Sequence, residues 1–233
     1  MTDREKDLEL GEQYAAESKR FGLLAGKHLF RAQWGYGEPE WYDHRLAWFL
    51  PEKHMVDFWA ASAHNVIQVT PLNSKMLDLC SGDGFYDYWF YRRRAHVTCI
   101  ERNQEAYDFA LKHYKHPRIK YILDDVLTCE LPKEEFDVVV IRGAIEHFSK
   151  ENQQLIFRRA NEALKVGGYF CGDTPAAQGD KKLLGSHEYE WADEWEMIAA
   201  LEPVFKPAMS VHTYTLESET RTTLFWQCQK GRE

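Results

Sequence analysis

The sequence predicts an α/β fold in which helices cover both faces of a mostly parallel β-sheet. From Lys75 onward, apolar strand-like runs alternate with helix-like runs, which is typical of parallel strands joined by crossover helices. No helix-like run separates the last two strand-like runs, so we expect them to form an antiparallel hairpin that closes the sheet. The expected strands are residues 76–80, 96–101, 118–123, 136–142, 167–173, 205–211 and 222–229, and the expected helices are 84–94, 103–114, 150–165 and 190–201.

The part of the chain before the sheet has a different composition. Residues 1–30 are charged and loosely patterned, with one helix expected from Leu8 to Phe21. Two further helices are expected over residues 41–49 and 55–67, because each places its aromatic and apolar residues on one side at helical spacing. We therefore predict an N-terminal helical cap over residues 1–70 and a sheet domain over residues 71–233.

The strands of the sheet domain end at turns that the sequence marks. The apolar run Met76–Cys80 stops at a short turn containing Gly82 and Gly84, and a helix-like aromatic segment follows at once. The helix that ends near Lys165 is followed by two glycines, which favour a helix stop.

Composition limits the classes of function. A hydrophobic content of 44% supports a real core, and the formal net charge of −8 argues against a nucleic-acid partner, although short arginine runs could still form a local basic face. The five cysteines are widely spaced and include no CxxC pair, which argues against a disulfide framework or a zinc knuckle. We find no signal peptide or membrane-spanning run and expect a cytoplasmic protein with no membrane partner.

The turn after Met76–Cys80 is the first candidate ligand site. A strand, a turn of little side-chain bulk and a helix start allow a nucleotide-like ligand to approach bare backbone at the carboxyl edge of the sheet. The third glycine of a dinucleotide fingerprint is absent, because Asp87 stands three residues after Gly84. This weakens a nicotinamide dehydrogenase hypothesis, which we keep as an alternative.

Three further loops at the same edge carry polar residues. Glu101 ends the second strand, where an acid can accept hydrogen bonds from both ribose hydroxyls; the alternative is an acid that favours a helix N-terminus. After the third strand, Asp125 can bind an adenine amino group, and the backbone N–H of Val126 can bind the ring. The fourth loop begins at Arg142, which we include among the cofactor-binding candidates.

At residues 75–229 the chain resembles the class I S-adenosylmethionine-dependent methyltransferases. The resemblance rests on Leu77–Gly84, Glu101, Asp125 and Phe136–His147 in this order and spacing. It implies a Rossmann-like seven-stranded sheet with the last strand antiparallel, and S-adenosylmethionine as cofactor, with S-adenosylhomocysteine as product. It also implies that Asp78 and Gly82 lie near the methionine moiety, Glu101 at the ribose, and Asp125 with Val126 at the adenine. Cys80 departs from the family, which usually has glycine there.

The acceptor side is predicted around His147, Glu146 and His187. His147 follows the fourth strand and could accept an acceptor proton near neutral pH; alternatively, it caps the next helix. The segment Ser186–Trp191 should overhang the same edge, so His187 could approach Glu146 and His147. Two histidines and a carboxylate could bind a metal, and the small-RNA 2′-O-methyltransferases have a similar pattern. They carry another glutamate where this chain has Gly143, so we expect no metal. His187 and Tyr189 could instead shape the acceptor pocket or bond locally across the loop.

The sequence favours a small polar acceptor. The segment His187–Trp191 and the tail near Trp226 resemble methyltransferases of bacterial surface-polysaccharide gene sets, which suggests a sugar or another small metabolite methylated on oxygen or nitrogen. Aromatic residues Trp34, Tyr36, Trp41 and Tyr42 could close over it, or form only a seam between cap and sheet. A metal-assisted RNA 2′-O-methyltransferase and a non-catalytic cofactor-binding module are the alternatives, and a homodimer is compatible with the sequence.

Overall fold

The computed structural model describes residues 3–35, 39–46, 53–177, 185–205, 211–217 and 221–232. The chain divides into two compact units, residues 1–56 and 57–233. Among the described residues, no helix has the length and apolar character needed to cross a membrane.

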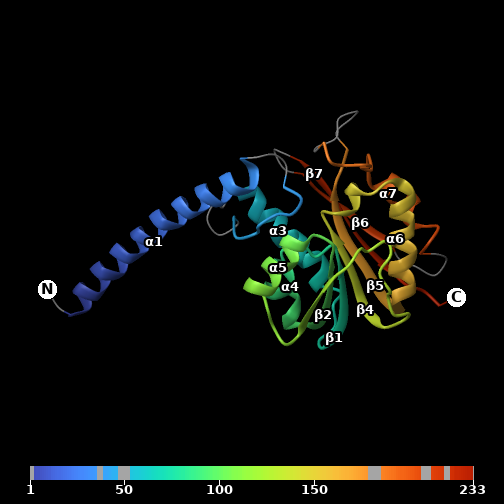
Figure 1. Ribbon diagram of the computed structural model, residues 1–233, viewed down its shortest axis with the longest axis horizontal. Helices are drawn as coiled ribbons and strands as arrows, with labels where there is room; N and C mark the ends of the chain where they lie inside the picture. The colour runs from blue at the N-terminus through green and yellow to red at the C-terminus, as the bar shows by residue number, and fades with distance from the viewer. Residues whose placement is uncertain are drawn as a thin grey trace. The chain divides into compact units, whose positions relative to one another are not determined.

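The second unit is built around one seven-stranded sheet (Figure 1). Its strands are β1 (Ser74–Leu79), β2 (Ala95–Glu101), β3 (Ile119–Leu123), β4 (Phe136–Arg142), β5 (Leu164–Pro175), β6 (Val211–Glu217) and β7 (Thr222–Gln229). The strand order is β3-β2-β1-β4-β5-β7-β6, and only β7 runs antiparallel to its neighbours. This confirms the predicted Rossmann-like sheet, including the closing hairpin.

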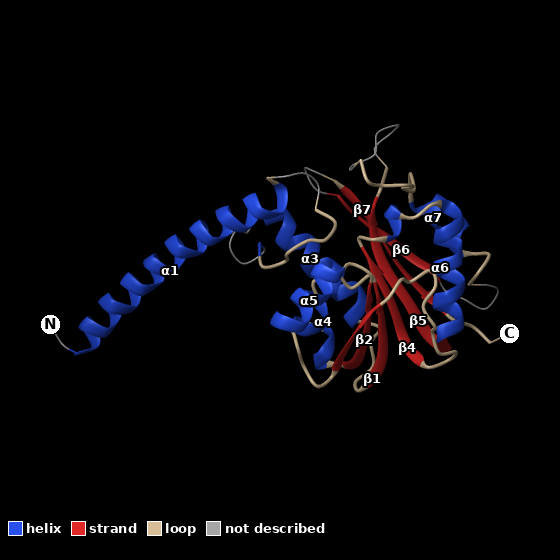
Figure 2. Cartoon of the chain, viewed as in Figure 1, coloured by secondary structure: helices blue, strands red, loops and turns tan. Residues whose placement is uncertain are grey.

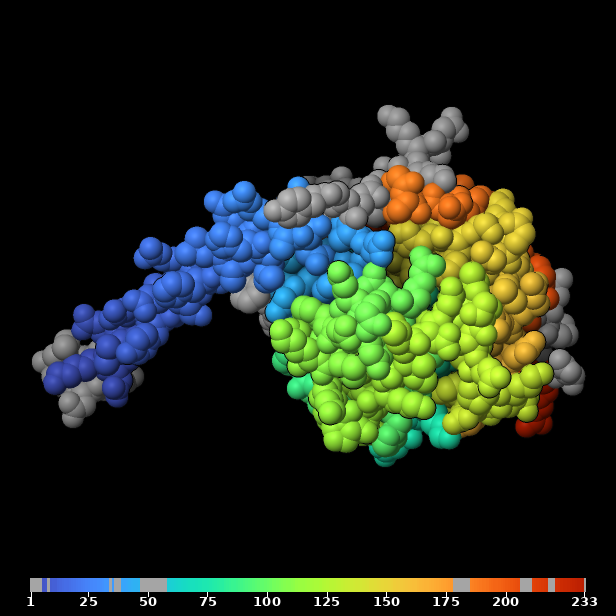
Figure 3. Space-filling model, viewed as in Figure 1, coloured from blue at the N-terminus to red at the C-terminus, as the bar shows by residue number. Residues whose placement is uncertain are grey.

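Helices cover both faces of the sheet (Figure 2). Those of this unit are α4 (Phe85–Trp89), α5 (Gln104–His113), α6 (Lys150–Ala163) and α7 (Glu194–Leu201), with two 3-10 turns, η1 (Tyr91–Arg93) and η2 (Ile145–His147). Helix α3 (Lys53–Ile67) joins α4 and α5 on one face, and α6 and α7 cover the other. In the space-filling view, green to yellow segments, α5 and α6 among them, hide the sheet (Figure 3).

Local sequence explains where these helices begin. Side chains of Asn103, Ser149 and Asp193 accept hydrogen bonds from the backbone N–H groups of Ala106, Asn152 and Glu196, which caps α5, α6 and α7. The β-branched run of β4 from Val138 to Ile141 is fully buried at the centre of the sheet.

Helix α3 is anchored on the sheet by polar contacts as well as by packing. The Asn65 amide donates to the carbonyl oxygens of Gly172 (3.1 Å) and Trp226 (3.2 Å), and the Gln227 amide donates to the Asn65 carbonyl at 2.7 Å. These contacts tie the end of α3 to the sheet, in the unit of residues 57–233.

Three predicted elements differ from the structure. Helix α1 spans Asp3–Trp34 instead of residues 8–21, and it ends at Gly35, whose N–H donates to the Arg31 carbonyl oxygen at 2.8 Å. Residues 41–46 contain mainly bends and turns where we expected a helix, since Asp43 binds the backbone N–H of Arg45 at 3.0 Å; residues 47–50 lie outside the described residues.

The sixth strand was also predicted wrongly. We expected it at residues 205–211, but Phe205 lies in a turn after α7 and β6 begins at Val211; residues 206–210 lie outside the described residues. Strand β6 is an edge strand of half-buried and exposed residues with no buried one, so it lacks the apolar run on which the prediction relied.

Candidate active site

The turn after β1 adopts a conformation that keeps its backbone accessible. Cys80, Gly82 and Gly84 have positive φ angles of 59°, 57° and 74°. A β-carbon built on Gly82 would meet no atom within 4 Å, so space is open beside this residue. At Gly84 the same atom would lie 2.6 Å from the Tyr121 hydroxyl oxygen, so glycine is required there. The turn therefore offers the bare backbone that a cofactor needs.

Glu101 lies directly against this turn. One carboxylate oxygen accepts a hydrogen bond from the Gly82 N–H at 2.8 Å, and the other accepts from the Asn103 N–H at 2.7 Å. The Glu101 side chain is thereby fixed between the end of β2 and the turn after β1. The structure brings these two predicted cofactor residues together.

The third loop is tied to the same place. The Asp124 N–H donates to the Glu101 carbonyl oxygen at 3.0 Å, and the Asp125 carboxylate accepts from the Leu127 N–H at 2.8 Å. Val126 is buried, whereas Asp125 is half-buried. Asp125 and Val126 thus follow Glu101 along the carboxyl edge of the sheet.

Beneath these loops lies a buried group of charges. The Arg142 guanidinium approaches Asp78 at 3.4 Å and lies 3.6 Å from the centre of the Tyr86 ring. Asp173 pairs in register with Arg142 on the neighbouring strand and accepts a hydrogen bond from the Ser62 hydroxyl at 2.5 Å. Arg142 is therefore held among carboxylates and aromatic rings. Asp78, which was also predicted as a cofactor residue, is fully buried.

Burial also controls the protonation of these acids. It raises the pKa of Asp78 and of Asp173, and the positive charge of Arg142 opposes the rise. The pKa of Asp87 lies well above its ordinary value, first because of burial and then because of the Asp78 charge. The sequence prediction missed Asp87, Asp173 and Ser62 as members of this group; only the position of Asp173 at the end of a strand was a usable signal.

The three predicted acceptor-side residues come together at the next loop. Glu146 and His147 lie in η2, and the ring of His147 lies edge-on to that of His187, with centroids 4.7 Å apart. Glu146 and His187 are buried and His147 is exposed. Helix α6 is capped by Ser149, so the alternative that His147 caps this helix is wrong.

Main-chain hydrogen bonds join the two loops that carry these residues. The Glu146 carbonyl oxygen accepts from the Glu188 N–H at 2.8 Å and the Tyr189 N–H at 3.1 Å. The buried Gln153 amide donates to the carbonyl oxygens of Ile145, Phe148 and Tyr189. Trp191 stacks on Phe157 of α6, which anchors the second loop. The cluster is therefore held rigidly from both sides.

The side chains of the cluster are also specifically partnered. The Thr174 hydroxyl donates to the Glu146 carboxylate at 2.9 Å, and Nδ1 of His187 contacts the Glu190 carboxylate. Burial raises the pKa of Glu146 to about 7, and hydrogen bonds from its own backbone N–H and from the Thr174 hydroxyl oppose the rise. Glu190, Gln153 and Thr174 were not predicted from the sequence.

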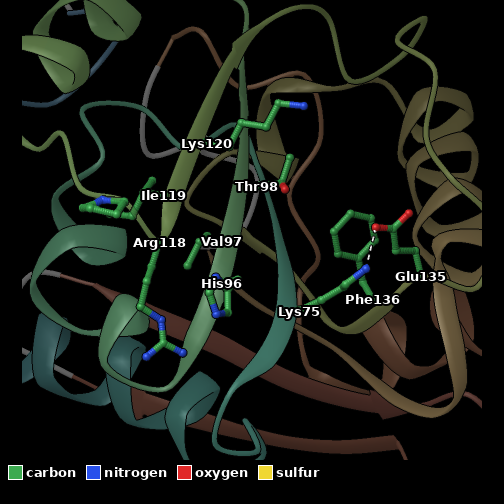
Figure 4. A pocket seen from close by; sticks show the side chains of 10 residues that line it. Lys75, His96, Val97, Thr98, Arg118, Ile119, Lys120, Glu135 and Phe136 are labelled. Atoms are coloured by element: carbon green, nitrogen blue, oxygen red, sulfur yellow. Dashed lines mark hydrogen bonds and ion pairs between the residues drawn. The ribbon is translucent and has the colours of Figure 1, made fainter.

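A hollow of about 200 Å³ lies at the opposite, amino-terminal edge of the sheet (Figure 4). Basic side chains dominate its lining, and Lys75 is paired with Glu135 at 2.9 Å. The predicted cofactor and acceptor residues all follow the carboxyl ends of strands, so this hollow is not part of the candidate site.

Comparison with known proteins gives the family. Residues 76–168 match the family described as a methyltransferase domain. The match confirms, for this part of the chain, the resemblance to the class I S-adenosylmethionine-dependent methyltransferases. The matched region begins in β1 and includes both the cofactor turn and the Glu146–His147 pair.

Two curated relatives illustrate how partial the sequence similarity is. A phosphoethanolamine N-methyltransferase of Plasmodium falciparum is 33% identical over 98 residues, covering 41% of this chain and 37% of the relative. An uncharacterized methyltransferase of Mycobacterium tuberculosis is 27% identical over 114 residues, covering 47% of this chain and 57% of the relative. The chain thus spans only about a third to a little over half of these relatives.

Solved structures agree on the fold. A phosphoethanolamine N-methyltransferase of Haemonchus contortus, in complex with S-adenosyl-L-methionine, matches with a TM-score of 0.62 at 15% identity, covering 75% of this chain and 53% of the other. The YcgJ protein of Bacillus subtilis matches with a TM-score of 0.61 at 14% identity, covering 75% of this chain and 100% of the other.

Proposed function

We propose that this protein transfers the methyl group of S-adenosylmethionine to an oxygen or nitrogen atom of a small polar acceptor. The observation that carries the proposal is the arrangement along one sheet edge. The open turn at Gly82, the fixed carboxylate of Glu101 and the Asp125–Val126 segment are joined by hydrogen bonds, and the Glu146–His147–His187 cluster follows the next strand.

The cofactor half of the site fits S-adenosylmethionine. Glu101 uses one direction of each carboxylate oxygen for a backbone N–H, so lone pairs on both oxygens stay available for two ribose hydroxyls. Asp125 and Val126 would bind the adenine, and Asp78 and Gly82 would lie at the methionine moiety. Gly84 shapes the turn, and Arg142 holds Asp78 in place. The open space beside Gly82 supports this assignment.

The acceptor half supplies a proton acceptor beside the methyl donor. The bound cofactor offers a methyl group on sulfonium sulfur, and transfer leaves S-adenosylhomocysteine. His147 is exposed, and we assign it the role of receiving the proton that the acceptor loses. The buried Glu146 and His187 orient His147. We propose that the main catalytic contribution of these three residues is to hold the acceptor atom in line with the methyl group.

The acceptor class is proposed from chemistry and from the relatives. The net charge of −8 argues against a nucleic acid. The Plasmodium falciparum relative is named as a phosphoethanolamine N-methyltransferase, which keeps a small amine in the proposal beside a sugar hydroxyl. The aromatic cap, the cytoplasmic location and the homodimer also remain proposals; of the cap aromatics, Tyr36 and the Trp34 side chain lie outside the described residues.

Calorimetric titration with S-adenosylmethionine and S-adenosylhomocysteine tests the cofactor assignment. We expect saturable binding by the wild-type chain and at least a tenfold weaker affinity for Glu101→Gln. The matched control is Glu135→Gln, which changes a carboxylate at the opposite edge of the sheet and should bind as tightly as wild type. Absence of binding by the wild-type chain would refute the proposal.

The acceptor is sought by S-adenosylhomocysteine release with panels of small amines and sugars. We expect at least one acceptor for the wild-type chain and a 10²–10⁴-fold slower transfer by His147→Ala at unchanged cofactor affinity. Equal transfer rates for both proteins would contradict the role of His147.

A further inference from the structure

We propose that Glu146, His147 and His187 bind one divalent transition-metal cation and leave a coordination position open toward the acceptor. Each residue offers one ligand atom, and these atoms all lie within 4.8 Å of one another. In the part of the chain that the structure describes, this is the one group of three potential ligands at such distances. The three residues come from two loops far apart in the sequence, so the fold itself assembles the group.

The ligands are built into the fold before any cation binds. The Glu146 carbonyl oxygen accepts two backbone N–H groups of the His187 loop, and the Thr174 hydroxyl holds the Glu146 carboxylate at 2.9 Å. Gln153 bridges carbonyl oxygens on both loops. A cation at this place would therefore need only small movements of side chains whose backbone is already fixed.

Glu190 supplies the outer contact that a metal-binding imidazole needs. Its carboxylate contacts Nδ1 of His187, and both side chains are buried. A carboxylate at Nδ1 holds the ring proton there, which leaves the lone pair of Nε2 for a ligand. The Glu190 carboxylate thus orients the ring of His187, with Nε2 left to bind a cation.

The donor set indicates which cations fit. Two imidazoles and one carboxylate suit zinc, iron(II), cobalt or manganese, whereas magnesium and calcium prefer oxygen ligands alone. Three protein ligands with one free position are typical of catalytic sites, and four are typical of structural ones. Gly143, which made a four-ligand set incomplete in the sequence, is therefore compatible with an open site.

The use of the cation rests on the proposed function, but its binding does not. An acceptor hydroxyl or amine in the open position would be oriented toward the methyl donor and would lose its proton more easily. With the cation bound, His147 would serve as its ligand in place of the proton-accepting role assigned to it above, and the acceptor proton would leave to solvent. This sharpens the acceptor class to one with an oxygen or nitrogen that can coordinate a metal.

Titration of the tag-free, chelator-treated full chain with Co²⁺, followed by visible absorption, tests the site, with Zn²⁺ as competitor. We expect one equivalent of Co²⁺ to bind with visible d–d bands and Zn²⁺ to displace it. His147→Ala, an exposed position expected to fold, should bind at least tenfold more weakly, and Glu190→Gln 10- to 100-fold more weakly. His96→Ala, at an exposed histidine of β2, is the matched control and should bind as wild type does.

Two results would overturn the proposal: no stoichiometric Co²⁺ binding by the wild-type chain, or equal affinities for His147→Ala and His96→Ala. Cofactor titrations on the same samples separate the two proposals. Retained S-adenosylmethionine binding without Co²⁺ binding would reject the cation site and leave the proposed methyl transfer standing.

Discussion

Cys80 provides a direct test of how the cofactor turn is held. Its φ angle is 59°, in the left-handed region that glycine adopts easily and other residues rarely adopt. A residue with a β-carbon pays roughly 1–2 kcal/mol for this conformation. We compare Cys80→Gly with Cys80→Ala, because both variants remove the thiol and they differ only in the β-carbon.

The expected difference follows from two opposing effects. Glycine removes the left-handed strain, but it also gives the unfolded chain more freedom, which costs about 0.5–1 kcal/mol. Cys80→Gly should therefore be more stable than Cys80→Ala by about 1 kcal/mol, taking the strain of roughly 1–2 kcal/mol. Burial raises the pKa of the Cys80 thiol well above its ordinary value, so ionisation of the thiol does not complicate a wild-type reference at neutral pH.

Urea denaturation followed by tryptophan fluorescence measures this difference, with thermal unfolding as a second readout. A difference of about 1 kcal/mol corresponds to roughly 2–4 °C in Tm for a chain of this size. S-adenosylmethionine should bind Cys80→Gly at least as tightly as Cys80→Ala. If the alanine variant is as stable as the glycine variant, the left-handed conformation is not an obligatory feature of the folded turn, and the reasoning fails.

Three further predictions concern the surroundings of this turn. Asp87→Asn should gain stability relative to wild type as the pH rises from 4 to 8. The pKa of Asp87 is raised in the folded state, so the folded wild-type protein binds this proton more tightly than the unfolded chain does and loses stability as the pH rises, whereas the asparagine variant does not. A difference in Tm between the two proteins that is the same at all pH values would contradict this. Gly84→Ala should cost about 1–3 kcal/mol, since its β-carbon meets the Tyr121 hydroxyl at a strained φ, and unchanged urea denaturation would refute the contact. Ser62→Ala should cost about 1.5–3 kcal/mol in the same assay, because Asp173 loses its hydroxyl donor, and a neutral effect would show that the bond contributes nothing.

The sequence was sufficient for the sheet because its central strands carry their own signals. Strands β1, β2 and β4 are apolar runs that end at polar or glycine-containing turns, and β4 is buried along its centre. Strand β6 lies at the sheet edge and has no buried residue, so its pattern resembles that of a loop. Edge strands and long exposed helices such as α1 are placed by contacts that local patterns reveal poorly.

The candidate site residues likewise fall into those that the sequence could predict and those that it could not. Glu101, Asp125 and His147 could be predicted because each follows the carboxyl end of a strand. Asp173 meets Arg142 through strand register, which a single sequence does not encode locally. Glu190 lies only three residues after its partner His187, so this spacing was a usable signal that the prediction did not use. Asp87 appeared in the sequence only as a missing glycine, and its burial depends on the packing of α4.

The two halves of the site are held in different ways, and this bears on how the protein could change its acceptor. The proposed cofactor half is joined by bonds between segments at the ends of adjacent strands: the Gly82 N–H donates to the Glu101 carboxylate, and the Asp124 N–H donates to the Glu101 carbonyl oxygen. In the proposed acceptor half, the loop of residues 185–191 is bound to Glu146 by its own backbone N–H groups. Trp191 anchors this loop by stacking on Phe157 of α6. Substitutions in residues 185–190 can therefore alter the acceptor surroundings while the bonds that shape the cofactor turn stay intact. Under the proposed function, substitutions in the loop that carries His187 are therefore expected to change acceptor preference while cofactor affinity stays the same.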